Sequence, residues 1–182
     1  MKKGIYLIGF SGSGKSTVAR LIATRLNWTA YDLDQVIVER SGMTIPTIFE
    51  REGEPGFRDR ETEALRAVSD SGHFVVATGG GAPVRPENRL IMASKGWVIC
   101  LEGKPETLLA RMQLQLEESD PAAARPMLGS GYPLDQIRSL KESRQSIYAL
   151  ADWTVHTDRL TSREVADEVI RATEVLEAHS SD

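Results

Sequence analysis

The sequence is poor in cysteine and in long apolar runs. One cysteine, Cys100, occurs in 182 residues, so no internal disulfide can form, and its apolar surroundings predict a packed core thiol in a reducing compartment. No apolar run approaches the roughly 18 residues that a membrane-spanning helix needs. The run from Ile5 to Ile8 is too short for a secretory signal. These absences predict a soluble, cytoplasmic protein with no membrane partner.

An excess of positive charge is also lacking. The chain has 22 Lys and Arg residues against 26 Asp and Glu residues, a formal charge of −4 at pH 7. Nucleic-acid phosphates favour a basic protein face, so this balance argues against a nucleic-acid partner. Internal repeats and low-complexity linkers are absent too. We therefore expect one domain over residues 1–182, acting as a monomer on small molecules.

Five short apolar segments are predicted to be strands, and helical patterns separate them. The strands are expected at residues 4–10, 29–32, 73–78, 97–102 and 152–156. The first helix should begin at Lys15, and a capping box of Thr161 and Glu164 should start the last. Strands that alternate with helices predict a three-layer α/β fold, a parallel sheet covered on both faces. Ligands of such sheets bind beyond the carboxyl ends of the strands.

A phosphate-binding loop follows the first predicted strand. The stretch GFSGSGKST fits the pattern G-x-x-x-x-G-K-[ST], and its candidate nucleotide contacts are Gly12, Ser13, Gly14, Lys15, Ser16 and Thr17. Its backbone N–H groups and the following helix N-terminus would cradle phosphates. Lys15 would reach the β and γ phosphates, and the Ser16 hydroxyl would ligate Mg²⁺. The alternative, a chance glycine-rich turn, is disfavoured by the flanking strand and helix.

Two aspartates, Asp32 and Asp34, lie at the end of the second predicted strand and two residues beyond it. Side chains alternate along a strand, so both would point to one side if the strand continues through Asp34. One carboxylate would support Mg²⁺, and the other would orient an acceptor hydroxyl and take its proton. The alternative is an N-cap aspartate with a solvated neighbour. The phosphate loop upstream favours the catalytic interpretation.

Three glycines end the third predicted strand, where many phosphate-loop NTPases carry an acidic residue for Mg²⁺. Without β-carbons, Gly79–Gly81 would let a small ligand lie against backbone N–H donors. The alternative is a flexible loop after a buried strand. Arg58 and Glu61 share one face of a predicted helix, although an isolated pair of this kind is usually a surface ion pair worth under about 1 kcal/mol. Together these features predict a site for a second substrate.

In this order, the motifs resemble those of the shikimate kinase family. The similarity runs from Ile5 to about His156, through the phosphate loop, the aspartate pair, FRDRE, GGGAP, ARM at 110–112, RPML at 125–128 and RQSIYALA at 144–151. The resemblance implies a nucleoside-monophosphate-kinase-like fold with strand order 2-3-1-4-5. It also implies a substrate-binding segment at about 33–62 and a mobile lid at about 112–130.

The resemblance implies transfer of the γ-phosphate of ATP, with Mg²⁺, to the 3-hydroxyl of shikimate, which yields shikimate 3-phosphate and ADP for aromatic amino-acid biosynthesis. The residues that would bind shikimate are Asp34, Arg58, Gly79, Gly80, Gly81 and Arg144. Asp34 would hold the acceptor hydroxyl and act as base, and Glu61 would orient Arg58. A guanidinium suits a carboxylate because it binds in a bidentate fork and stays charged when water is excluded.

On the nucleotide side, the resemblance implies that Ser16 and Asp32 hold Mg²⁺ and that Arg111 stacks on the adenine; the alternative for Arg111 is a helix-surface arginine. Lid residue Arg125 would join Lys15 and Asp34 in catalysis by covering the phosphates. The sequence departs from the family pattern at Leu33, where Ser or Thr is frequent, and in a long lid. The second adenine-contacting segment, near HTDRLTS, cannot be matched.

Two other functions fit part of the pattern. GFSGSGKS also looks like the phosphate loop of gluconate kinases, but the triglycine and F-R-x-x-E features argue against a kinase of another polyol acid. A nucleotide-binding regulatory module without catalysis would not need Lys15, Asp34 and Arg125. The histidines, at positions 73, 156 and 179, are expected to be non-catalytic.

Overall fold

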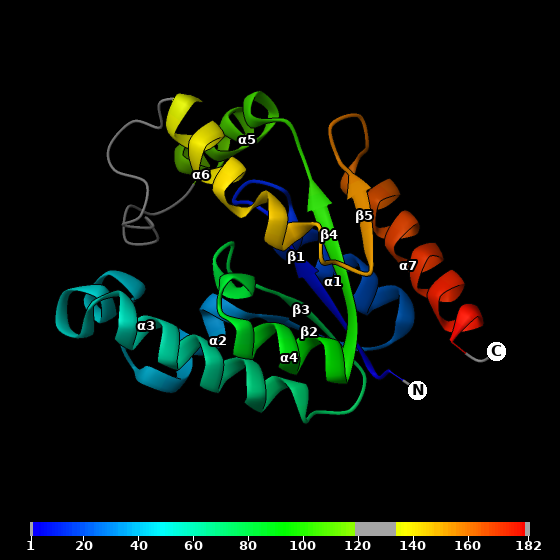
Figure 1. The fold of residues 1–182 in the computed structure, drawn as a ribbon, viewed down its shortest axis with the longest axis horizontal. Coiled ribbons are helices and arrows are strands. Elements are labelled where there is room, and N and C mark those ends of the chain that lie inside the picture. Colours follow the sequence, from blue (N-terminus) through cyan, green and yellow to red (C-terminus); the bar gives the residue numbers. More distant parts are fainter. Residues whose placement is uncertain (1, 119–133, 181–182) are drawn as a thin grey trace.

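Side-chain alternation along the strands builds two apolar cores, one on each face of a single sheet. The helices lie on both sides of that sheet (Figure 1). The structure, a computed structural model, describes residues 2–118 and 134–180. The strands are β1 (Gly4–Ile8), β2 (Thr29–Asp32), β3 (Phe74–Ala77), β4 (Gly96–Glu102) and β5 (Trp153–His156). All neighbouring pairs are parallel, in the order β2-β3-β1-β4-β5, which confirms the predicted strand order.

Helices cover both faces of the sheet. They are α1 (Lys15–Leu26), α2 (Leu33–Ser41), α3 (Ile45–Ser69), α4 (Pro86–Lys95), α5 (Pro105–Glu118), α6 (Leu134–Tyr148) and α7 (Ser162–His179), with a short 3₁₀ helix, η1 (Ala82–Val84). In β1, Ile5 and Leu7 pack with α1 and α7, whereas Tyr6 and Ile8 pack on the opposite face with helices that include α3, α4 and α6. This three-layer arrangement is the predicted α/β fold.

The local predictions differ from the structure mainly at strand ends. β1 ends at Ile8, and not at residue 10 as predicted, because the chain turns at Gly9 (φ 133°) into the phosphate loop. The Thr161–Glu164 capping box is confirmed: each side chain accepts a hydrogen bond from the other residue's backbone N–H. Cys100 is buried, as expected, and burial raises the pKa of its thiol to about 12.

A bend divides α3 and sets the direction of its second half. Gly53 has φ 68° and ψ −174°, outside the helical region, and Pro55 follows it. Proline is tolerated in a first helical turn, so the helix restarts there. The second half carries Phe57, Arg58 and Glu61. Within residues 2–118 and 134–180, no helix is long and apolar enough to cross a membrane.

Candidate active site

The phosphate loop folds around the ammonium of Lys15. Gly14 (φ 89°) is the N-cap residue of α1, so the helix N-terminus points into the loop. Lys15 Nζ donates hydrogen bonds to the carbonyls of Gly9 (3.0 Å) and Phe10 (2.8 Å), and the side chain is buried. The loop therefore holds a cation beside backbone N–H donors, an arrangement suited to bind phosphate.

The two aspartates do not lie on one strand, so the condition for both side chains to share one side of β2 is not met. β2 ends at Asp32, whose Oδ1 accepts a 3.1 Å hydrogen bond from the Asp34 N–H and so caps α2. Asp34 lies in the first turn of that helix. The N-cap alternative thus holds for Asp32. Its other oxygen, Oδ2, accepts a 2.5 Å hydrogen bond from Ser16 Oγ, which ties α2 to the phosphate loop.

The oxygens of Ser16 and Asp32 suit a divalent cation. Mg²⁺ usually takes one or two protein oxygens and fills its other positions with phosphate oxygens and water. The part of the chain that the structure describes contains no cluster of three or more His, Cys, Asp or Glu side chains able to hold a metal alone. The pair therefore suits a cation that arrives with a nucleotide.

The triglycine turn is packed against side chains of the protein itself. A β-carbon built on Gly81 would lie 2.6 Å from Arg58 Nη2, and one on Gly79 would lie 2.8 Å from Glu61 Oε1 and 3.3 Å from Asp34 Oδ1. The contacts with Arg58 and Glu61 are too close for any other residue type without displacement of those groups, whereas Asp34 would need to move by only a few tenths of an ångström. The sequence interpretation, room for a ligand, was therefore incomplete, because two of the glycines make room for an arginine and two carboxylates.

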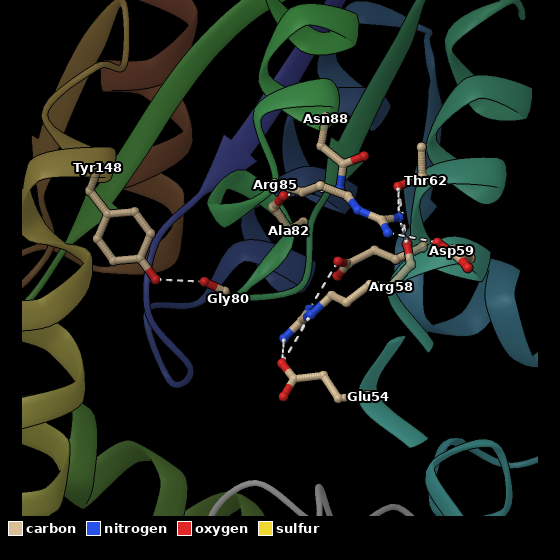
Figure 2. Close-up of polar contacts among 10 residues, drawn as sticks. Glu54, Arg58, Asp59, Thr62, Gly80, Ala82, Arg85, Asn88 and Tyr148 are labelled. Atoms are coloured by element: carbon tan, nitrogen blue, oxygen red, sulfur yellow. Dashed lines mark hydrogen bonds and ion pairs between the residues drawn. The ribbon is translucent and has the colours of Figure 1, made fainter. Parts of the chain in front are cut away.

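Arg58 is held between two carboxylates of its own helix (Figure 2). Nη1 donates to Glu61 Oε2 at 2.9 Å, and Nη2 donates to Glu54 Oε1 at 3.1 Å. Burial lowers the pKa of Arg58, but the two glutamates outweigh burial and raise it above its ordinary value. Glu61 is fully buried and Glu54 is exposed. The guanidinium is thus fixed in position and permanently charged.

Glu54 was not among the residues predicted from the sequence. It precedes Arg58 by four residues, the spacing of a favourable ion pair on a helix, and this spacing could have identified it.

One cavity joins the residues predicted to bind the second substrate. It measures roughly 550 Å³ with its open mouth included. Its polar lining contains Asp34, Arg58, Glu61, Gly79, Gly80, Gly81 and Arg144, and its apolar lining contains Phe10, Ile45, Phe49, Phe57 and Leu140. The Phe49 and Phe57 rings stack 4.7 Å apart and form part of the apolar wall. This cavity suits a small anion with an apolar face.

A second cavity, of roughly 830 Å³, opens on the other part of the phosphate loop. Ser13, Gly14 and Thr17 line it together with Arg111 and the segment around Thr157–Ser162. Arg111 is fixed there, because Nη1 donates to Thr157 Oγ1 (2.9 Å) and Nη2 to the Thr157 carbonyl (2.7 Å). The segment that sequence analysis could not match therefore lies in this cavity.

Some predicted features fall elsewhere. The first part of the expected lid, up to Glu118, continues α5, and Arg125 lies in residues 119–133, outside the described part of the chain. His73, His156 and His179 line neither of the two cavities.

The phosphate loop thus lines both cavities: Phe10 and Ser11 face the first, and Ser13, Gly14 and Thr17 face the second. A shared phosphate loop, a buried lysine and a neighbouring cavity with cations and a carboxylate define a phosphate-loop kinase of small molecules. The family model described as shikimate kinase matches residues 11–174. The chain belongs to the shikimate kinase family.

Curated and solved relatives agree with this family. A shikimate kinase of Geobacter sulfurreducens is 40% identical over 167 residues, which cover 92% of this chain and 88% of the relative. A shikimate kinase of Thiobacillus denitrificans is 43% identical over 159 residues, which cover 87% of this chain and 83% of the relative. A solved shikimate kinase from Acinetobacter baumannii, in complex with shikimate, superposes with a TM-score of 0.86 at 34% identity over 96% of this chain and 94% of that one.

Proposed function

We propose that the chain transfers the γ-phosphate of ATP to the 3-hydroxyl of shikimate. The observation that carries this proposal is the phosphate loop with a cavity on each side, one nucleotide-sized and the other lined by Asp34, Arg58 and Arg144. A nucleotide in the second cavity would direct its terminal phosphate over the loop toward the first. The 40% identity with a curated shikimate kinase supports the same reaction.

The acceptor cavity suits shikimate in charge and shape. Arg58 and Arg144 supply cations for its carboxylate, and a guanidinium binds a carboxylate in a bidentate fork. The stacked Phe49 and Phe57 rings face the apolar part of the six-membered ring. We assign residues 33–62 as the substrate-binding segment, because α2 and α3 carry Asp34, Arg58 and most of this wall.

Asp34 is the residue best placed to orient the acceptor hydroxyl. It lines the acceptor cavity and is only half-buried, beside the triglycine turn. Its carboxylate accepts a hydrogen bond from the hydroxyl and takes the proton as the oxygen attacks phosphorus. Phosphoryl transfer needs little further covalent chemistry from the protein, so positioning and charge account for most of the catalysis.

The remaining residues act on the phosphates. Lys15 neutralises charge on the β and γ phosphates, and in doing so exchanges its loop carbonyls for phosphate oxygens. Ser16 and Asp32 would hold Mg²⁺, which when bound offsets the negative charge of the phosphates. Arg111 packs against the adenine. Arg125 is our candidate for the residue that stabilises charge in the transition state.

The proposed activity is tested by ADP release in a coupled assay with ATP and one acceptor at a time. Shikimate should support steady ADP release, gluconate should not, and ATP alone should give only slow hydrolysis. Turnover of gluconate without turnover of shikimate would reject the proposed substrate. ATP binding without any acceptor-dependent ADP release would reject catalysis.

A Gly81→Ala variant is expected to raise the KM for shikimate roughly tenfold, the effect of losing about 1.4 kcal/mol of a charge-assisted contact. Gly81 has φ −98°, which alanine accepts, so the fold should be retained. The added β-carbon would meet the Arg58 guanidinium and push it out of place. Steady-state kinetics with shikimate and with ATP would measure the effect, and the KM for ATP should not change.

Gly72→Ala is the matched control, because a β-carbon on Gly72 meets no atom within 4 Å. It should leave both KM values unchanged. An unchanged KM for shikimate in Gly81→Ala would contradict the role given to the position of Arg58.

A further inference from the structure

A buried tyrosine on α6 connects two parts of the acceptor site. Tyr148 is the last residue of α6, four residues after Arg144, and only 1% of its surface is exposed. Its hydroxyl donates a 2.7 Å hydrogen bond to the carbonyl of Gly80, in the middle of the triglycine turn (Figure 2). Tyr148 does not line the acceptor cavity, so it acts only through the residues that do.

The Tyr148 hydroxyl stays protonated over the working range of an enzyme. Burial raises its pKa to about 12, and the nearby charge of Arg144 lowers it only in part. A hydroxyl has one donor hydrogen, and Tyr148 gives it to the Gly80 carbonyl. The Arg144 guanidinium lies beside the same turn, because its Nη1 is 3.6 Å from the position that a β-carbon on Gly80 would take.

The bond to Gly80 also sets the direction of the Gly81 N–H, a hydrogen-bond donor that faces the substrate in the proposed function. A peptide group is planar and trans, so its carbonyl and the N–H of the next residue point in opposite directions. A contact that fixes the Gly80 carbonyl thus fixes the Gly81 N–H. On its other side, the turn is anchored by Asn88, whose Nδ2 donates a 3.0 Å hydrogen bond to the Ala82 carbonyl. Tyr148 is the corresponding anchor from α6.

We propose that Tyr148 is a positioning residue of the acceptor site, whose hydroxyl orients the Gly80–Gly81 peptide toward the substrate and holds in place the turn beside which Arg144 lies. The inference rests on the proposed function, in which the turn and Arg144 contact shikimate. It adds that the turn is anchored from α6, the helix that carries Arg144, so the loss of one hydroxyl loosens the backbone donors of the site.

Tyr148→Phe tests this role, because phenylalanine retains the buried ring and removes only the hydroxyl. The KM for shikimate should rise about 3- to 10-fold, the range expected for loss of one hydrogen bond. The KM for ATP and kcat should change little. Tyr6→Phe is the matched control: Tyr6 is fully buried, and its hydroxyl bonds Ser69 Oγ at 2.6 Å, away from both cavities. Tyr6→Phe should lower the thermal midpoint about as much as Tyr148→Phe does, and it should leave the KM for shikimate unchanged.

Amide hydrogen exchange of the protein without substrate gives a second readout, which does not depend on the reaction. The Ala82 and Val84 amides donate within the turn, to Gly79 and Gly81 carbonyls. Their exchange should be about 3- to 10-fold faster in Tyr148→Phe than in Tyr6→Phe if the anchor is lost.

Equal exchange in the two variants, an unchanged KM for shikimate, or an equal rise in the KM for ATP would overturn the proposal. If the wild-type protein fails to use shikimate, the proposed function fails, and the exchange measurement alone then decides whether Tyr148 anchors the turn.

Discussion

Replacement of Asp34 by asparagine is expected to lower kcat with shikimate by roughly a hundredfold or more, the usual contribution of a general base. Asparagine has the same shape and can still hydrogen-bond the acceptor hydroxyl, but it cannot take the proton. Asp34 lies in the first turn of α2, and the Asp32 cap holds its backbone. Asp32 caps the helix through the backbone N–H of Asp34, so the substitution leaves this cap intact. The fall in kcat should therefore reflect the loss of the base and not a change in structure.

The measurement for Asp34→Asn combines the coupled ADP assay with calorimetric titration of ATP. ATP should bind the variant and the wild type alike, because Asp34 lines only the acceptor cavity. Glu39→Gln is the control: it removes the same charge from an exposed position on α2 and should leave kcat unchanged. Near-normal turnover by Asp34→Asn would show that Asp34 has no catalytic role.

Much of the fold was predictable because its signals are local. The start of α1 at Lys15 and the Thr161–Glu164 capping box depend on residues a few positions apart, and both predictions are confirmed. Strands that alternate with helices predicted a parallel sheet covered on both faces. The strand order did not follow from these patterns, since crossovers alone allow several orders; it came from the family resemblance.

Contacts between distant segments could not be predicted. Side-chain alternation could not decide whether the second strand continues to Asp34, and the Asp32 side chain prevents this by capping α2. The glycine at position 81 is explained only by the Arg58 guanidinium that lies against it, and the Tyr148 bond to Gly80 spans 68 positions. Residue types identified this site, but tertiary packing determines why each residue is there.

Replacement of Arg58 by alanine should raise the KM for shikimate by roughly 30- to 700-fold, which corresponds to about 2 to 4 kcal/mol for a charge-assisted contact in a partly enclosed site. Arg58 already lies against the triglycine turn and is held by Glu61 and Glu54, so its guanidinium is in position before the substrate binds. The KM for ATP should not change. Arg60→Ala is the control, because Arg60 pairs with Glu52 on the same helix and lines neither cavity.

Arg58→Ala should also lower the thermal midpoint, because it removes a partner of the fully buried Glu61 carboxylate. The double variant Arg58→Ala with Glu61→Gln separates stability from binding. A neutral amide costs less to bury than a carboxylate, so the double variant should regain thermal stability while the KM for shikimate stays high. Recovery of shikimate affinity together with stability would mean that Arg58 supports the fold and does not bind the substrate.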